Sequence, residues 1–171
     1  ITHLINFLKF SKPERFNIKS VIVWGGRNPL EKLPQYDWLN LYEIKQLNRN
    51  PIERIIWHNI WFDQLVRKSG CDILYIPGGL FLGKFRPYVA LCQTLLPFNN
   101  IELNQYGFSK RTFRLKLLRH GQTMTFKRSN GNIFLTKYAK QFVTDKILPL
   151  KNIPSEIIPH GVDQAFVNNN Q

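Results

Sequence analysis

Short apolar runs that end in glycine, proline or small polar residues recur along the chain, and they constrain its fold most. They are rich in β-branched and aromatic residues, and helical patterns separate most of them. The runs cover residues 20–24, 72–76, 89–96, 133–135 and 156–158, with a weaker run at 36–41. Strands that alternate with helices predict an α/β fold with a mostly parallel sheet, in which ligands bind beyond the carboxyl ends of the strands.

Helical signals accompany these runs. Residues 1–10 carry apolar side chains at one-face spacing, and residues 138–147 form a second helical pattern. Asn50 as N-cap and Gly70 just past the end bracket a helix rich in tryptophan and isoleucine. Ser109 is placed to cap a long helix that extends to about Lys127. The apolar seam of this long helix is expected at Phe113, Leu117 and Met124.

Composition limits the classes of protein that the chain can belong to. Its 171 residues fit one domain, and 24 basic against 11 acidic residues give a net charge of +13, which favours an anionic partner. Cys71 and Cys92 have neither zinc nor CxxC spacing, which favours a reducing compartment. No apolar run reaches the roughly 18 residues that cross a bilayer. We therefore expect a cytoplasmic protein, peripheral at the inner face of the membrane.

Motifs for common cofactors do not occur in the sequence. It contains neither GxGxxG after a strand nor GxxxxGK[ST], and its histidines lack metal-ligand spacing, so no metal site is predicted. The glycine pairs at 25–26 and 78–79 allow a close backbone approach to a ligand or a positive φ, or else simple tight turns. A basic cluster at residues 110–128 is interleaved with phenylalanines. It fits anionic lipid, nucleic-acid phosphates or a solvated helix face, and no RNA- or DNA-binding signature accompanies it.

Five strings, taken in order, resemble the amino-terminal, acceptor-side domain of family 4 glycosyltransferases, a group with the GT-B fold. They are ILYIPG (73–78), CQTLLPF (92–98), RLKLLRHGQ (114–122), IFLTKYAK (133–140) and IPHGVD (158–163). The resemblance covers essentially the whole chain. It implies a Rossmann-like three-layer domain at residues 1–163, with a twisted sheet and helices on both faces, that lacks its first strand. Residues 164–171 would begin an interdomain linker or tail.

The same resemblance implies a function. Members transfer a sugar from a nucleotide-sugar donor to an acceptor with retention at the anomeric carbon. The chain would supply the acceptor side, and the partner would be the missing carboxy-terminal domain that binds the nucleotide sugar. This domain alone would bind no cofactor and would be inactive. The expected acceptor is a glycan, a lipid-linked sugar or a small molecule. Separately from the resemblance, the excess positive charge makes an anionic membrane surface a further expected partner.

Strand ends supply the candidate binding residues. The residues expected to face the acceptor are Gly78, Gly79, Gln93, Thr94, Phe98, Asn28 and Arg86. Those expected at the interdomain cleft are Thr136, Lys137, His160 and Gly161. Many family members place a His-Asp pair where this chain has Gln93 and Thr94, and neither residue is a general base near neutral pH. No catalytic residue is therefore assigned.

A competing interpretation uses the same scaffold without catalysis. The chain would then be a binding module that holds a protein partner or nucleic acid on its basic face, nucleic acid being the less favoured of the two. An upstream glycine-rich strand and loop and a downstream α/β domain in the coding sequence would favour the transferase. Stop signals close to Gln171 would favour the module.

Overall fold

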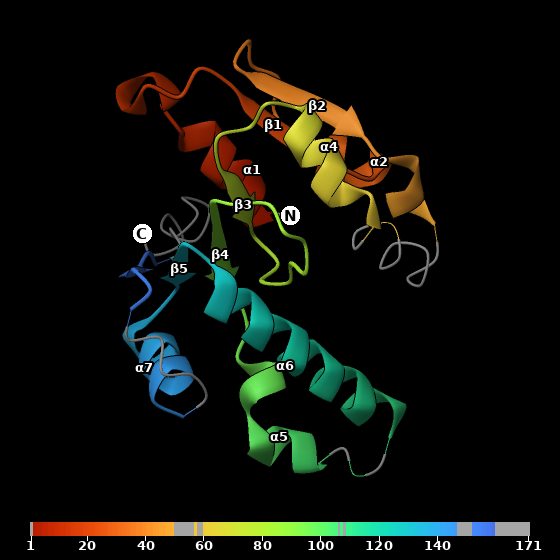
Figure 1. The fold of residues 1–171 in the computed structure, drawn as a ribbon, viewed down its shortest axis with the longest axis vertical. Coiled ribbons are helices and arrows are strands. Elements are labelled where there is room, and N and C mark those ends of the chain that lie inside the picture. The colour runs from red at the N-terminus through yellow and green to blue at the C-terminus, as the bar shows by residue number, and fades with distance from the viewer. Residues whose placement is uncertain are drawn as a thin grey trace, which may run out of the picture. The chain divides into compact units, whose positions relative to one another are not determined.

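The computed structural model describes residues 2–49, 57, 60–105, 107, 109–146 and 152–159. The chain divides into two compact units, Ile1–Phe62 and Asp63–Gln171. Each unit contains a parallel sheet and helices (Figure 1). The structure thus confirms an α/β fold with parallel sheets flanked by helices, as in Rossmann-like proteins. The expected domain extent, residues 1–163, stays a prediction.

The first unit is built on two parallel strands. Its elements are α1 (Thr2–Phe10), the 3-10 helix η1 (Pro13–Phe16), β1 (Val21–Gly25), α2 (Arg27–Leu30), β2 (Leu39–Glu43) and the 3-10 helix η2 (Lys45–Asn48). Val21 pairs with Leu39 and Val23 with Leu41, so these four apolar side chains share one face of the sheet. The predicted helix at 1–10 and strand at 20–24 are confirmed within one or two residues. The run at 36–41 becomes a strand only from Leu39.

That shared face carries the core of the first unit. Leu8 of α1, Leu30 at the end of α2, and Leu33 are buried against Leu39, and Leu4 and Ile5 pack on the same cluster. Apolar residues one turn apart explain why α1 forms with this face inward. Pro13 lacks the backbone N–H that a longer helix would need, and the chain turns at Asn17, whose φ is 55°.

The second unit holds four parallel strands. Its elements, after α4 (Phe62–Lys68) at the unit boundary, are β3 (Leu74–Ile76), β4 (Tyr88–Cys92), η3 (Leu96–Phe98), α5 (Asn100–Gln105), α6 (Lys110–Arg128), β5 (Gly131–Phe134), α7 (Lys137–Lys146) and β6 (Ser155–Ile157). The strand order is β3-β4-β5-β6, and every neighbouring pair is parallel. The helices after β4 and β5 make the crossovers that parallel pairing needs.

The run at 89–96 is not one strand, which corrects the sequence interpretation. β4 ends at Cys92, and residues 93–95 turn away before η3. Thr94 Oγ1 accepts a hydrogen bond from the Leu96 N–H at 3.2 Å, which closes this turn. The Leu96 N–H is used by this turn, and Pro97 has no N–H to donate to a strand ladder, so pairing could not have resumed there.

The predicted cap of α6 is confirmed, but the predicted seam is wrong. The Ser109 side chain accepts from the Thr112 N–H at 3.2 Å. Phe113, Leu117 and Met124 are 72%, 62% and 38% exposed. The buried face consists instead of Thr112, Leu115, Gly121, Gln122, Thr125 and Phe126. Half of these residues are polar, so counting apolar side chains selected the opposite face of the helix.

Some sequence predictions lie outside the described residues. These are the Asn50 cap, with most of the helix that it would begin, and the site candidates His160 and Gly161. Gly70 is described, and its φ of 70° confirms the predicted end of α4. Within the described ranges, no helix combines the length and the apolar character that crossing a membrane requires.

Candidate functional site

The four parallel strands of the second unit end at one edge of their sheet, which we call the carboxyl edge. It consists of Pro77–Gly79 after β3, Gln93–Leu95 after β4, Leu135–Thr136 after β5 and Ile158–Pro159 after β6. Neighbouring strands lie about 4.8 Å apart, so consecutive corners are adjacent. The expectation that these corners share one edge is confirmed for this sheet.

Gly78 and Gly79 form the corner after β3 and differ sharply from each other. Gly79 has a φ of +65°, and a Cβ there would lie 2.9 Å from the Leu91 carbonyl oxygen. Gly78 is exposed, and a Cβ there would meet nothing within 4 Å. Gly79 therefore fits the positive-φ, tight-turn interpretation of the glycine pair, whereas Gly78 presents bare backbone to open space.

Gln122 of α6 also contacts this corner, although no signal in the sequence pointed to it. Its side chain is buried, with 4% of the residue exposed, and Nε2 donates to the Gly78 carbonyl oxygen at 3.4 Å. The opposite amide orientation would set two carbonyl oxygens against each other, so the Oε1 atom must point away from Gly78. Oε1 is buried and has no partner among the described residues. Oε1 is therefore an unsatisfied acceptor inside the unit, while the Nε2 bond ties Gln122 to the corner.

Gln93 and Thr94, at the next corner, are exposed. The Thr94 hydroxyl is engaged by the turn that follows β4, which leaves the Gln93 amide as the freer group of the pair. Phe98 does not share this position. It is 2% exposed, and its ring lies 6.2 Å from the Phe126 ring, centre to centre. Its side chain therefore belongs to the core rather than to the open edge.

Thr136 and Lys137 stand at the corner after β5, as expected. Thr136 Oγ1 accepts from the Ala139 N–H at 3.0 Å and so caps α7. Lys137 is exposed at the first position of that helix and supplies a positive charge at the carboxyl edge. The capping role gives Thr136 a structural function whether or not a ligand binds beside it.

Arg86 does not lie at the carboxyl edge, and Asn28 belongs to the first unit. Arg86 precedes β4 and so lies toward the opposite, amino end of that strand. Its guanidinium donates to the Phe85 carbonyl oxygen at 2.7 Å and stacks 4.4 Å from the centre of the Tyr88 ring. Asn28 is exposed in α2 of the first unit. The position of Arg86 therefore adds no side chain to the corner formed by Gly78 and Gly79.

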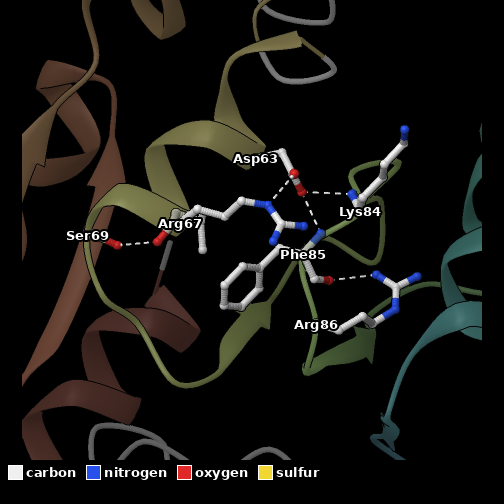
Figure 2. Close-up of polar contacts among 7 residues, drawn as sticks. Asp63, Arg67, Ser69, Lys84, Phe85 and Arg86 are labelled. Carbon is white, nitrogen blue, oxygen red and sulfur yellow. Dashed lines mark hydrogen bonds and ion pairs between the residues drawn. The ribbon is translucent and has the colours of Figure 1, made fainter.

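Asp63 anchors the connection that runs from this corner to β4 (Figure 2). Its Oδ1 atom accepts from the backbone N–H groups of Lys84, at 2.7 Å, and Phe85, and Oδ2 accepts from Arg67 Nε at 3.0 Å. Burial raises the pKa of the Asp63 carboxyl, but the hydrogen bonds from Arg67, Phe85 and Lys84 outweigh burial and leave it lowered overall. The carboxylate is thus held ionised as an acceptor.

A second anchor lies nearer the glycines. Thr125 of α6 is fully buried, and its hydroxyl accepts from the Phe81 N–H at 2.8 Å. The same hydroxyl is within 2.9 Å of the Gly121 carbonyl oxygen, to which it can donate. Thr125 and Asp63 together pin the connection at Phe81 and Phe85, which fixes the backbone that presents Gly78.

The described part of the carboxyl edge offers neutral hydrogen-bonding groups and the Lys137 cation. Cys92 is the thiol nearest to it, and burial raises the pKa of that thiol to about 11, which removes it as a nucleophile near neutral pH. No group of three or more His, Cys, Asp or Glu that could hold a metal ion occurs within the described ranges. The edge is therefore suited to binding and orienting a polar ligand.

Comparisons with known proteins add no relative. No family model, curated protein or solved structure matches this chain.

Proposed function

We propose that the chain is the acceptor-side domain of a retaining glycosyltransferase, which orients an acceptor hydroxyl toward a nucleotide-sugar donor held elsewhere. The observation that carries the proposal is the carboxyl edge of β3–β6. There Gly78 presents exposed backbone with open space where a Cβ would stand, and the adjacent corner presents the exposed amide of Gln93. Parallel α/β sheets bind their ligands at this edge, which supports the placement. The motif series between residues 73 and 163 supports the choice of reaction.

The side chains at the edge favour a hydroxylated ligand over a charged one. The exposed Gln93 amide both donates and accepts hydrogen bonds, and the backbone of Gly78 is exposed at the adjacent corner. Lys137 is the cation that the described part of this edge offers, which is too little for a diphosphate. The acceptor is therefore a glycan, a lipid-linked sugar or a small polyol, and the donor diphosphate is bound by another domain.

Positioning is the catalytic contribution that these residues can make. Neither the Gln93 amide nor the Thr94 hydroxyl can act as a proton acceptor near neutral pH, so that corner of the edge lacks a general base. Holding the acceptor hydroxyl close to the anomeric carbon converts an encounter into a reaction within one complex. The anchors at Thr125 and Asp63 support this role because they hold the connection that follows Gly78, at Phe81 and at Lys84. It follows that residues 1–171 alone release no nucleoside diphosphate from nucleotide sugars.

Helix α6 favours the competing function of a non-enzymatic binding module. It carries seven lysines and arginines and no acidic residue over its 19 residues. Most of these cations are exposed, as a surface for a polyanion or an acidic protein partner would require. Binding of duplex or single-stranded nucleic acid with a steep salt dependence, in a protein that lacks transferase activity, would favour this function.

The test uses the full open reading frame that encodes the chain. Purified protein is incubated with a panel of uridine- and guanosine-diphosphate sugars and polyol acceptors, and release of the nucleoside diphosphate is measured. NMR of the product then gives the anomeric configuration. Release that depends on the acceptor, with retention, supports the proposal. Absence of release with every donor, or inversion at the anomeric carbon, overturns it.

A matched pair of glutamines tests the site itself. Gln93→Ala removes an exposed amide from the carboxyl edge, whereas Gln141→Ala removes an exposed amide from the middle of α7. Loss of one or two neutral hydrogen bonds predicts an acceptor KM raised about three- to tenfold in the first variant. The second variant should match the unmodified protein. Equal KM values in the two variants would remove Gln93 from the binding site.

A further inference from the structure

The end of α1 and the turn after it expose large apolar side chains on the first unit. Phe7, Phe10, Phe16 and Ile18 are 51%, 74%, 75% and 46% exposed. Single exposed apolar residues are common on protein surfaces, but a cluster within one short segment marks an interaction site. Phe10 is the last residue of α1 and Phe16 the last of η1, so helical turns fix both positions.

These side chains line a hollow in the surface of the first unit. The hollow has a volume of about 410 Å³, and Phe7, Phe10, Phe16 and Ile18 all line it. Trp38 also contributes to its lining. We call the hollow that these five side chains line the aromatic hollow. Its surface is concave and apolar, so filling it removes hydrocarbon surface from water without burying an unpaired polar group.

Positive charge flanks the aromatic hollow. Lys9, Lys12, Arg15 and Lys19 are all exposed, and Lys12 and Arg15 also line the hollow. Glu14 is the one acidic residue between positions 9 and 19, which leaves this segment with a net charge of +3. An apolar surface flanked by cations matches a partner that is apolar within and anionic at its boundary.

We propose that the aromatic hollow and its flanking cations bind the surface of an anionic phospholipid bilayer. Phenylalanine side chains on a cationic, helix-based surface insert at the boundary between headgroups and acyl chains, and lysine and arginine contact the headgroup phosphates. A nucleic-acid strand fits less well, because it needs cations along its track, whereas this surface is apolar at its centre. The inference does not depend on the proposed glycosyl transfer.

Vesicle co-sedimentation of the full-length protein tests the proposal. One set of vesicles contains phosphatidylcholine alone, and the other contains equal amounts of phosphatidylcholine and phosphatidylglycerol. The protein should sediment with the anionic vesicles at low salt and be partly released by high salt. Phe10→Ser combined with Phe16→Ser should lower the partition coefficient about tenfold or more. Lys12→Gln combined with Arg15→Gln should lower it about thirtyfold at low salt, at about 1 kcal/mol for each basic residue.

A matched control separates this surface from basic helix α6. Phe113 on α6 is 72% exposed among lysines and arginines, so Phe113→Ser makes the same chemical change elsewhere. It should sediment like the unmodified protein. Circular dichroism should show unchanged folding in all variants, because the replaced side chains are exposed. The proposal is overturned by equal sedimentation of the Phe10/Phe16 variant and the unmodified protein. An equal loss of sedimentation in the Phe113 variant would also overturn it. So would self-association of the unmodified protein, without vesicle binding, that the Phe10/Phe16 variant abolishes.

Discussion

Replacing each glycine of the 78–79 pair by alanine gives a sharp test of the carboxyl edge. A Cβ at Gly79 would lie 2.9 Å from the Leu91 carbonyl oxygen, and the residue has a φ of +65°. A Cβ at Gly78 would meet nothing within 4 Å, and its φ lies outside the left-handed region. The same chemical change at neighbouring positions should therefore have opposite effects on stability.

The size of the difference follows from two costs. The left-handed conformation costs alanine about 1–2 kcal/mol. The Leu91 backbone is paired with Ile133 in the middle of the sheet and cannot retreat, so the overlap costs about another 1–3 kcal/mol. We expect Gly79→Ala to lower the free energy of unfolding by about 3 kcal/mol. Gly78→Ala should leave it unchanged or raise it by up to about 1 kcal/mol, because alanine restricts the unfolded chain.

The assay must report on the second unit. All four tryptophans, at positions 24, 38, 57 and 61, lie in the first unit, so tryptophan fluorescence does not monitor Gly79 directly. Hydrogen exchange of peptides that contain β4 does. A loss of about 3 kcal/mol speeds exchange through cooperative opening about a hundredfold. Equal exchange rates in Gly79→Ala and Gly78→Ala would refute the close approach to Leu91.

Three further predictions concern buried and anchored groups. Asp63→Asn should lower the free energy of unfolding, measured by urea titration, by about 1–2 kcal/mol at neutral pH. Because the pKa of Asp63 is lowered below 3.8 in the folded protein, this difference should vanish as the pH falls through that lowered value. The same change at exposed Asp72 should have little effect at any pH. Cys92 is 3% exposed and its pKa is raised to about 11, so it should resist iodoacetamide until the protein unfolds, whereas the partly exposed Cys71 should be labelled first. Mass spectrometry of peptides gives the order of labelling, and early labelling of Cys92 would contradict its burial. Thr125→Val should destabilise by about 1–3 kcal/mol in thermal melts, because it leaves a buried backbone N–H unpaired, and Thr125→Ser should retain most of the stability.

Local sequence signals predicted much of the fold and part of the candidate site. Ser109 capped α6 and Gly70 ended α4, because each acts on backbone groups within a few residues. The corners after β3, β4 and β5 also met at one edge, because parallel pairing brings strand ends together. Gln122 was missed because a polar residue in a helix gives no sign of facing inward. Phe98 was assigned to the ligand because an aromatic residue after a strand looks the same whether it is buried or exposed.

The sequence by itself determined the elements, their parallel arrangement and the identity of the corner residues, since these follow from periodicity, caps and glycine stereochemistry. Tertiary structure alone decided which face of α6 is buried and which groups meet at the corner. Gln122 lies 44 residues from Gly78, and Asp63 lies 22 residues from Phe85. Such partners are chosen by packing across the whole unit, where one polar contact is satisfied only when many distant apolar contacts are already in place.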